Sequence, residues 1–144
     1  MTVASGSKLS LEDFVGAWQI ERSILDKRAQ ANGRLTGTAT FAPSENGLSY
    51  FESGLLELPG HTPFQAERRY QWRFIDDEIV VEFQDGRPFH RFDPGSPSAS
   101  HWCDPDTYNV KYEFSSWPKW RSIWDVSGPK KDYQMITTYT RNPI

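Results

Sequence analysis

The sequence lacks the features that mark several classes of protein. It holds one cysteine, Cys103, so no internal disulfide can form, which agrees with a reducing compartment. No stretch approaches the about 20 apolar residues of a membrane span. The opening MTVASGSKLSLEDF also lacks the basic start and apolar run of a signal peptide. We therefore expect a soluble cytoplasmic protein with no membrane partner.

No charge of one sign dominates, and no phosphate-binding loop is present. The 16 basic and 19 acidic residues are well mixed and leave a formal charge of −3. Such a chain has no long-range field to gather nucleic acid, so we expect no nucleic-acid partner. No glycine-rich loop precedes a helical segment, so a nucleotide is not indicated and we expect no cofactor.

Helical periodicity is confined to one short segment near the N-terminus. Leu11, Phe14 and Val15 are spaced as on one face of a helix, and Ser10 can cap its start. The spacing predicts a short helix that ends at Gly16. Beyond it the alternation has period two, and aromatic residues make up 15% of the chain, which favours strands.

Ten segments follow this alternation, with turn signals such as Asn46-Gly47 and Asp85-Gly86 between them. The predicted strands are Ala17–Leu25, Arg34–Phe41, Leu48–Leu56, Gln65–Phe74, Glu78–Phe83, Arg87–Phe92, Ser98–Cys103, Thr107–Phe114, Lys119–Val126 and Lys131–Arg141. Within the fourth strand the inward face is predicted to carry Ala66, Arg68, Tyr70, Trp72 and Phe74.

This order of elements predicts an all-β fold, an up-and-down antiparallel barrel of about ten strands with a short N-terminal helix. A two-layer sandwich is the alternative, but closure removes exposed strand edges. The 144 residues fit a single domain over 1–144, with residues 1–9 flexible.

Two separated features resemble the calycin and lipocalin-like barrels. Gly16-Ala17-Trp18 opens the first strand, and Arg141 ends the last. In that group an arginine or lysine from the last strand covers the G-x-W tryptophan near the closed end, so the resemblance implies that Arg141 covers Trp18. The wider pattern, from RRYQWRF and HWCDPDTY to TTYTR, is similar to a small uncharacterised bacterial family of lipocalin-like domains. Ile20 and Arg22 replace the further glycines of nitrobindin-like haem barrels, so no haem is implied.

Alternating strand directions place alternate loops at one end of the barrel. If Trp18 marks the closed end, the loops around 26–33, 58–64, 84–87, 104–107 and 127–131 surround the mouth. HWCDPDTY is then a strand, a turn at the mouth and the next strand. The last strand ends at the floor, where Arg141 can meet Trp18.

Charged residues interrupt the predicted inward faces. Arg22, Glu52, Arg68 and His90 share the parity of apolar neighbours. Because an unpaired buried charge is destabilising, each needs a partner, a water or a ligand. One alternative is an internal Arg22–Glu52 ion pair that only fills space.

The leading hypothesis is a barrel that encloses a small, partly apolar or aromatic ligand with an acidic or carbonyl group. Arginine holds such a group through two parallel hydrogen bonds, and aromatic side chains provide the apolar wall. The candidate ligand-binding residues are Arg22, Glu52, Arg68, Tyr70, Trp72, Cys103, Trp124, Lys130 and Tyr133.

The alternative is a cofactor-independent enzyme, an isomerase, cyclase or hydrolase, in the same cavity. Its candidate acid–base residues are His90, His101, Asp106 and Tyr108, because a histidine titrates near neutral pH and a carboxylate can orient it. Cys103 beside a histidine has the residue types of a nucleophile. His90, His101 and Cys103 could also hold zinc, but the short-spaced ligand pairs of zinc motifs are missing, and we assign no metal site.

A third hypothesis is an adaptor that binds another protein. It requires Trp117 and Trp120, beside Pro118, to be exposed, and a homodimer through that segment is a further option.

Overall fold

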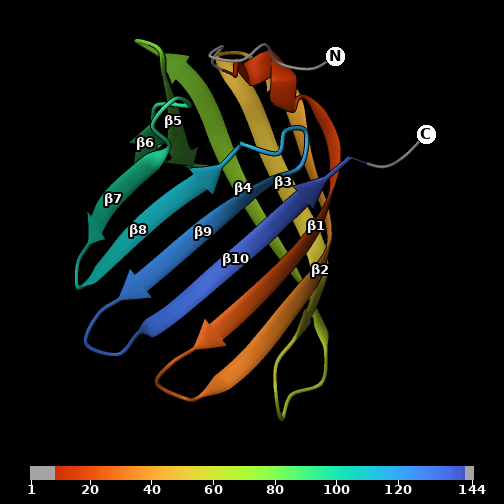
Figure 1. The fold of residues 1–144 in the computed structure, drawn as a ribbon, viewed down its shortest axis with the longest axis vertical. Helices are drawn as coiled ribbons and strands as arrows, with labels where there is room; N and C mark the ends of the chain where they lie inside the picture. Colours follow the sequence, from red (N-terminus) through yellow and green to blue (C-terminus); the bar gives the residue numbers. More distant parts are fainter. Residues whose placement is uncertain (1–8, 142–144) are drawn as a thin grey trace.

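The computed structural model describes residues 9–141, and it confirms the predicted all-β barrel (Figure 1). The ten strands are β1 (Gly16–Asp26), β2 (Ala31–Ser44), β3 (Gly47–Glu57), β4 (Phe64–Ile75), β5 (Glu78–Phe83), β6 (Pro88–Phe92), β7 (Ser98–Cys103), β8 (Asp106–Glu113), β9 (Trp120–Ser127) and β10 (Asp132–Thr140). Residues 1–9 were expected to be flexible. Of these, residues 1–8 lie outside the described residues, and Leu9 is buried in the core.

All strands belong to one antiparallel sheet. Strands adjacent in sequence pair, apart from β6 and β7, and β1 also pairs with β10, so the spatial order is β6-β5-β4-β3-β2-β1-β10-β9-β8-β7. In the described chain, β6 and β7 pack against each other without a ladder of paired residues. The barrel is therefore nearly closed, with one seam.

The strand directions give the barrel two different ends. The β1–β2, β3–β4 and β9–β10 connections lie together at the lower end of Figure 1, opposite the N-terminal turn. HWCDPDTY forms the end of β7, a turn at Asp104-Pro105 and the start of β8, as predicted. Along β8 the alternation holds, because Val110 and Tyr112 are buried whereas Asn109 and Lys111 are exposed.

The predicted N-terminal helix is only a single 3₁₀ turn, η1 (Leu11–Phe14). Val15 is already extended, with φ −56° and ψ 134°. Gly16 has φ +118°, and a Cβ there would lie 2.8 Å from the Arg141 guanidinium. Pairing of β1 with β2 begins at Gly16, so the sheet replaces the helix before a second turn can form.

This turn closes the floor of the barrel together with Arg141. The Arg141 guanidinium lies 3.7 Å from the centroid of the Trp18 ring, which confirms the predicted pair. It also donates hydrogen bonds to the carbonyl oxygens of Asp13 (2.9 Å) and Val15 (3.0 Å). The Trp18 indole N–H donates to the Phe14 carbonyl at 2.9 Å, so side chain and turn are fixed to each other.

The core above the floor is largely aromatic. It includes Trp117 and Trp120, the residues required to be exposed in the adaptor hypothesis. Trp117 packs with ring centroids 5.1 Å from Phe14 and 5.5 Å from Trp18. Trp120 is 1% exposed and stacks on Tyr139 at 3.7 Å. An adaptor face built on Trp117 and Trp120 is therefore wrong, because both rings are used within the chain.

Two further observations complete the fold. Phe74, predicted to face inward, is 43% exposed because it lies at the end of β4, beside the turn at Asp76-Asp77 and beyond the aromatic core. Within residues 9–141 no helix has the length and apolar character needed to cross a membrane.

Candidate functional site

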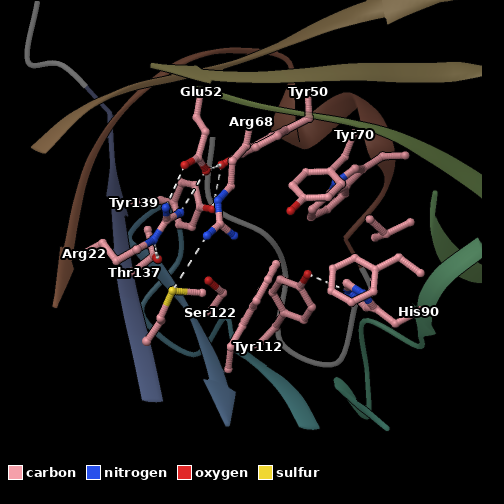
Figure 2. Close-up of a pocket in the computed structure, with 15 residues that line it drawn as sticks. Arg22, Tyr50, Glu52, Arg68, Tyr70, His90, Tyr112, Ser122, Thr137 and Tyr139 are labelled. Carbon is pink, nitrogen blue, oxygen red and sulfur yellow. Dashed lines mark hydrogen bonds and ion pairs between the residues drawn. The ribbon is translucent and has the colours of Figure 1, made fainter. Parts of the chain in front are cut away.

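Two adjacent cavities lie inside the barrel toward its mouth. The inner cavity (Figure 2) has a volume of about 20 Å³, which is room for about one water molecule. The mouth cavity has about 130 Å³, close to the roughly 150 Å³ of a cavity known to hold benzene. Four residues lie between the cavities and line both: Arg68, Tyr70, Phe89 and Trp124.

A buried ion pair forms one wall of the inner cavity. Arg22 donates from Nη1 to Glu52 Oε2 (2.7 Å) and from Nη2 to Glu52 Oε1 (2.8 Å). Its Nε donates to Thr137 Oγ1 at 2.7 Å, and Thr137 is the β10 residue that pairs with Arg22 on β1. Strand β2 separates β1 from β3, and its residue opposite Glu52 is the small Ala39, which leaves room for Arg22 to reach across.

The electrostatics of this pair keep both groups charged. Burial alone would raise the pKa of Glu52, but the hydrogen bonds and charge of Arg22 and the hydrogen bond from Tyr50 hold it below its usual range. Burial likewise acts to lower the pKa of Arg22, yet Glu52 raises it above its usual value. All three nitrogen positions of Arg22 are occupied, so its charge is already matched inside the protein.

Tyrosine hydroxyls extend the network from Glu52. Tyr50 donates to Glu52 Oε1 at 2.5 Å and lies 2.9 Å from the Tyr139 hydroxyl. Burial and the nearby Glu52 charge raise the pKa of Tyr139 to about 12, so this hydroxyl stays neutral near pH 7.

Arg68 is in a different position from Arg22. It is half-buried and pairs with Glu52 across the β3–β4 ladder, but among residues 9–141 it forms no ion pair with a carboxylate. Its guanidinium lies 5.4 Å from the Trp124 ring centroid and 4.0 Å from Met135 Sδ. Burial raises the pKa of Tyr70, and the nearby charge of Arg68 acts against that rise. A cation with unmatched charge therefore stands at the junction of the two cavities.

His90 lies on the opposite wall of the inner cavity (Figure 2). Its Nε2 is 2.8 Å from the Tyr112 hydroxyl, and its buried Nδ1 has no hydrogen-bond partner. Burial, with a smaller effect from the charge of His101, lowers the pKa of His90 to about 3. The imidazole is therefore neutral at physiological pH.

The mouth cavity gathers several of the residues singled out in the sequence. His101 is half-buried, with its ring 5.5 Å from that of Phe89, and Cys103 is exposed at the rim. Tyr108 and Tyr133 also line this cavity. Of the candidate residues, the mouth cavity thus brings together Arg68, Tyr70, His101, Cys103, Tyr108, Trp124 and Tyr133.

Other candidates lie apart from the mouth. Arg22, Glu52, Trp72 and His90 line only the inner cavity. Asp106 is buried and paired with Lys131 Nζ at 2.9 Å, and neither it nor the exposed Lys130 lines either cavity.

Nine residues that line these cavities are not among the candidates from the sequence. They are Tyr50, Val81, Phe83, Phe89, Tyr112, Ser122, Met135, Thr137 and Tyr139. Period-two parity with Tyr133 points to the three on β10, Met135, Thr137 and Tyr139. Period-two alternation does not predict Phe89. The β5–β6 register shifts between Val81 and Glu82, and the successive residues Phe89 and His90 are both buried.

No metal centre emerges from this arrangement. Within the described range 9–141, no three or more His, Cys, Asp or Glu side chains gather in a way that could hold an ion. In particular, His90 faces the inner cavity while His101 and Cys103 line the mouth.

Comparisons with known proteins agree with the fold. A family model described as a family of unknown function (DUF6314) matches residues 14–141. The S-type phycobiliprotein lyase CpeS from Guillardia theta superposes with a TM-score of 0.60 at 10% sequence identity, over 93% of this chain and 91% of that chain. The AttH-like protein NE1406 of Nitrosomonas europaea is aligned over all of this chain and 59% of its own at 9% identity, but its TM-score of 0.30 is too low to support an argument. No curated protein sequence matches the chain. The lyase likeness supports a lipocalin-like calycin fold and, at this identity, nothing beyond the fold.

Proposed function

The chain belongs to DUF6314, a family of unknown function, and we propose that it is a small-molecule-binding barrel. The ligand is a planar, partly apolar molecule with a carboxylate or similar oxygen group. It occupies the mouth cavity, with the oxygen group at Arg68 and the ring among Tyr70, Phe89 and Trp124.

The single observation that carries this proposal is the unmatched charge of Arg68. The inner cavity is lined by two arginines, Arg22 and Arg68, and by one glutamate, Glu52. Because Arg22 neutralises Glu52, one positive charge is left. A half-buried guanidinium interacts more strongly with an anion than an exposed one does, because less water screens it. Arginine also presents a fork of donors that matches a carboxylate.

The size of the mouth cavity restricts the ligand. At about 130 Å³ it accepts a single aromatic ring and not a drug-sized molecule, which needs roughly 300 Å³ or more. The surrounding rings supply apolar area and flat faces, so a planar ligand is favoured.

Arg22 and Glu52 support the site without needing to touch the ligand. Glu52 is the only acid that lines the inner cavity or the mouth cavity in the described chain. Because Arg22 engages both of its oxygens, Glu52 does not neutralise Arg68, its partner in the ladder.

A titration with benzoate tests the proposal. Followed by ¹H–¹⁵N NMR, benzoate should shift the signals of Arg68 and Trp124, and Arg68→Met should weaken binding by about 10-fold to 100-fold, as expected for a hydrogen bond to a charged group. Arg69→Met is the matched control, because Arg69 is the next residue of β4 and is exposed on the outer face. Native mass spectrometry of the purified protein should reveal a retained small anion. Equal benzoate binding by the two variants would contradict the role of Arg68.

One observation favours an enzyme as the second candidate. His101, Tyr108 and Cys103 line the same cavity as Arg68, so a bound ligand would contact an imidazole. His90 is less suited as a base, because its pKa is about 3 and its Nε2 already contacts Tyr112. Once the native ligand is identified, turnover that disappears in His101→Ala while binding persists would establish this candidate.

The cytoplasmic location stays a prediction from the sequence.

A further inference from the structure

A second hollow adjoins the mouth cavity, and Tyr133 is the one residue that lines both. It measures about 340 Å³ and lies at the lip of the barrel, between the β1–β2 hairpin and the β3–β4 connection. Its lining is Ile24, Asp26, Ala29, Ala31, Asn32, Gly33, Leu58, Pro59, His61 and Tyr133. We call this hollow the aliphatic compartment and the mouth cavity the aromatic compartment.

The aliphatic compartment exists because small residues occupy the inner side of β2 near the mouth. Ala31 and Gly33 lie at successive inward positions of this strand. A Cβ on Gly33 would lie 2.7 Å from Leu58 Cδ2 and 3.3 Å from the Glu57 carbonyl oxygen. Because Gly33 has no side chain, Leu58 can pack directly against the β2 backbone. The small Ala31 side chain leaves the neighbouring space inside the hollow open.

Tyr133 forms the partition between the compartments. It is half-buried on β10 and shares the inward parity of Met135 and Thr137. On the aromatic side it lines the cavity together with Tyr108. A single side chain therefore separates a space the size of one ring from a larger, mostly apolar space.

We propose that the ligand is an elongated amphiphile, with a carboxylate-bearing ring in the aromatic compartment and an alkyl or similar apolar tail passing Tyr133 into the aliphatic compartment. This inference rests on the proposed function and names the class of ligand more closely. The shared wall at Tyr133 supports it, since apolar space lies directly beyond that side chain from a ring held at Arg68. The polar residues that line the aliphatic compartment are Asp26, Asn32 and His61, and Asp26 pairs with Tyr133 across the β1–β10 ladder.

The test compares benzoate, 4-propylbenzoate and 4-pentylbenzoate by NMR titration of the full chain. Each buried methylene should tighten binding by about fourfold, so Kd should fall steadily along the series. Ala31→Phe fills the aliphatic compartment and should abolish this dependence on length while leaving benzoate affinity unchanged. Ala42→Phe is the matched control, because it makes the same change on the same strand at an exposed position near the other end. Ala31→Phe carries its own folding control, since benzoate binding reports an intact Arg68 site.

The outcomes separate this inference from the proposed function. Benzoate binding with no gain from the alkyl tail would overturn the inference and leave the proposed function standing. A gain that survives in Ala31→Phe would also overturn it, because the tail would then lie elsewhere. Size-exclusion chromatography in which Ala31→Phe dissociates a dimer would assign the hollow to a second copy instead. Failure of all three compounds to bind would overturn the proposed function itself.

Discussion

Replacing Arg22 by Met should impair ligand binding even though Arg22 does not touch the proposed ligand. In the native chain both oxygens of Glu52 are held by Arg22. Arg68 lies opposite Glu52 in the β3–β4 ladder and already contributes to the low pKa of its carboxyl. Without Arg22, Glu52 would pair with Arg68, and the charge offered to the ligand would disappear. Benzoate affinity should therefore fall about as far as in Arg68→Met.

The same rearrangement sets the magnitude of the stability change. Breaking a buried pair by removing one partner costs about 3–5 kcal/mol when the other charge stays unmatched. That value applies to Glu52→Gln, because the Arg22 side chain is only 6% exposed and neither cavity has another acid in the described chain. Arg22→Met should cost less, about 1–3 kcal/mol, since Arg68 can replace the lost partner while some charged hydrogen bonds are lost.

Urea unfolding and benzoate titration of the two variants measure both quantities. The expected result is an asymmetry, with Glu52→Gln the less stable protein and Arg22→Met the weaker binder. If Arg22→Met binds benzoate as the parent does, Glu52 does not transfer to Arg68 and the reasoning fails. Equal destabilisation by the two variants would show that Arg68 cannot replace Arg22.

Two further predictions concern pH and the floor. His90 has a pKa of about 3 in the folded chain, below the about 6.5 of an unfolded histidine, so its contribution to stability is present above pH 6.5 and is lost as pH falls. The free energy of unfolding should drop by up to about 1.4 kcal/mol per pH unit between pH 6 and 4, and His90→Gln should flatten this slope in urea titrations. Gly16→Ala should destabilise the protein by about 1–3 kcal/mol, because it combines φ +118° with a Cβ 2.8 Å from Arg141. Gly60→Ala meets nothing within 4 Å at φ +77°, so the smaller loss expected there measures the backbone strain alone, and equal losses would argue against the contact with Arg141.

The strands could be predicted because period-two alternation is a local signal. Glu78–Phe83 and Ser98–Cys103 have the bounds expected from the sequence. Parity also placed Arg22, Glu52 and Arg68 on the inner face. It could not place Phe89, because one register shift between β5 and β6 turns two successive residues inward. Nor could it show that η1 stops after four residues, since that depends on the pairing of β1 with β2.

The charge of Arg22 is matched and that of Arg68 is not, because the strands beside them differ in length. The alternation of inward and outward residues does not reveal these lengths. Arg22 is flanked on both sides, by β2 and by β10, and the β10 partner Thr137 supplies an acceptor for its Nε. Pairing between β4 and β5 begins only at Tyr70. Arg68 therefore lies in a part of β4 that has no paired β5 residue beside it. On that side Arg68 faces the mouth cavity instead of a neighbouring strand. A longer β5 with an acid opposite Arg68 would match the second arginine as well, and the barrel would then have no charge to offer an anion.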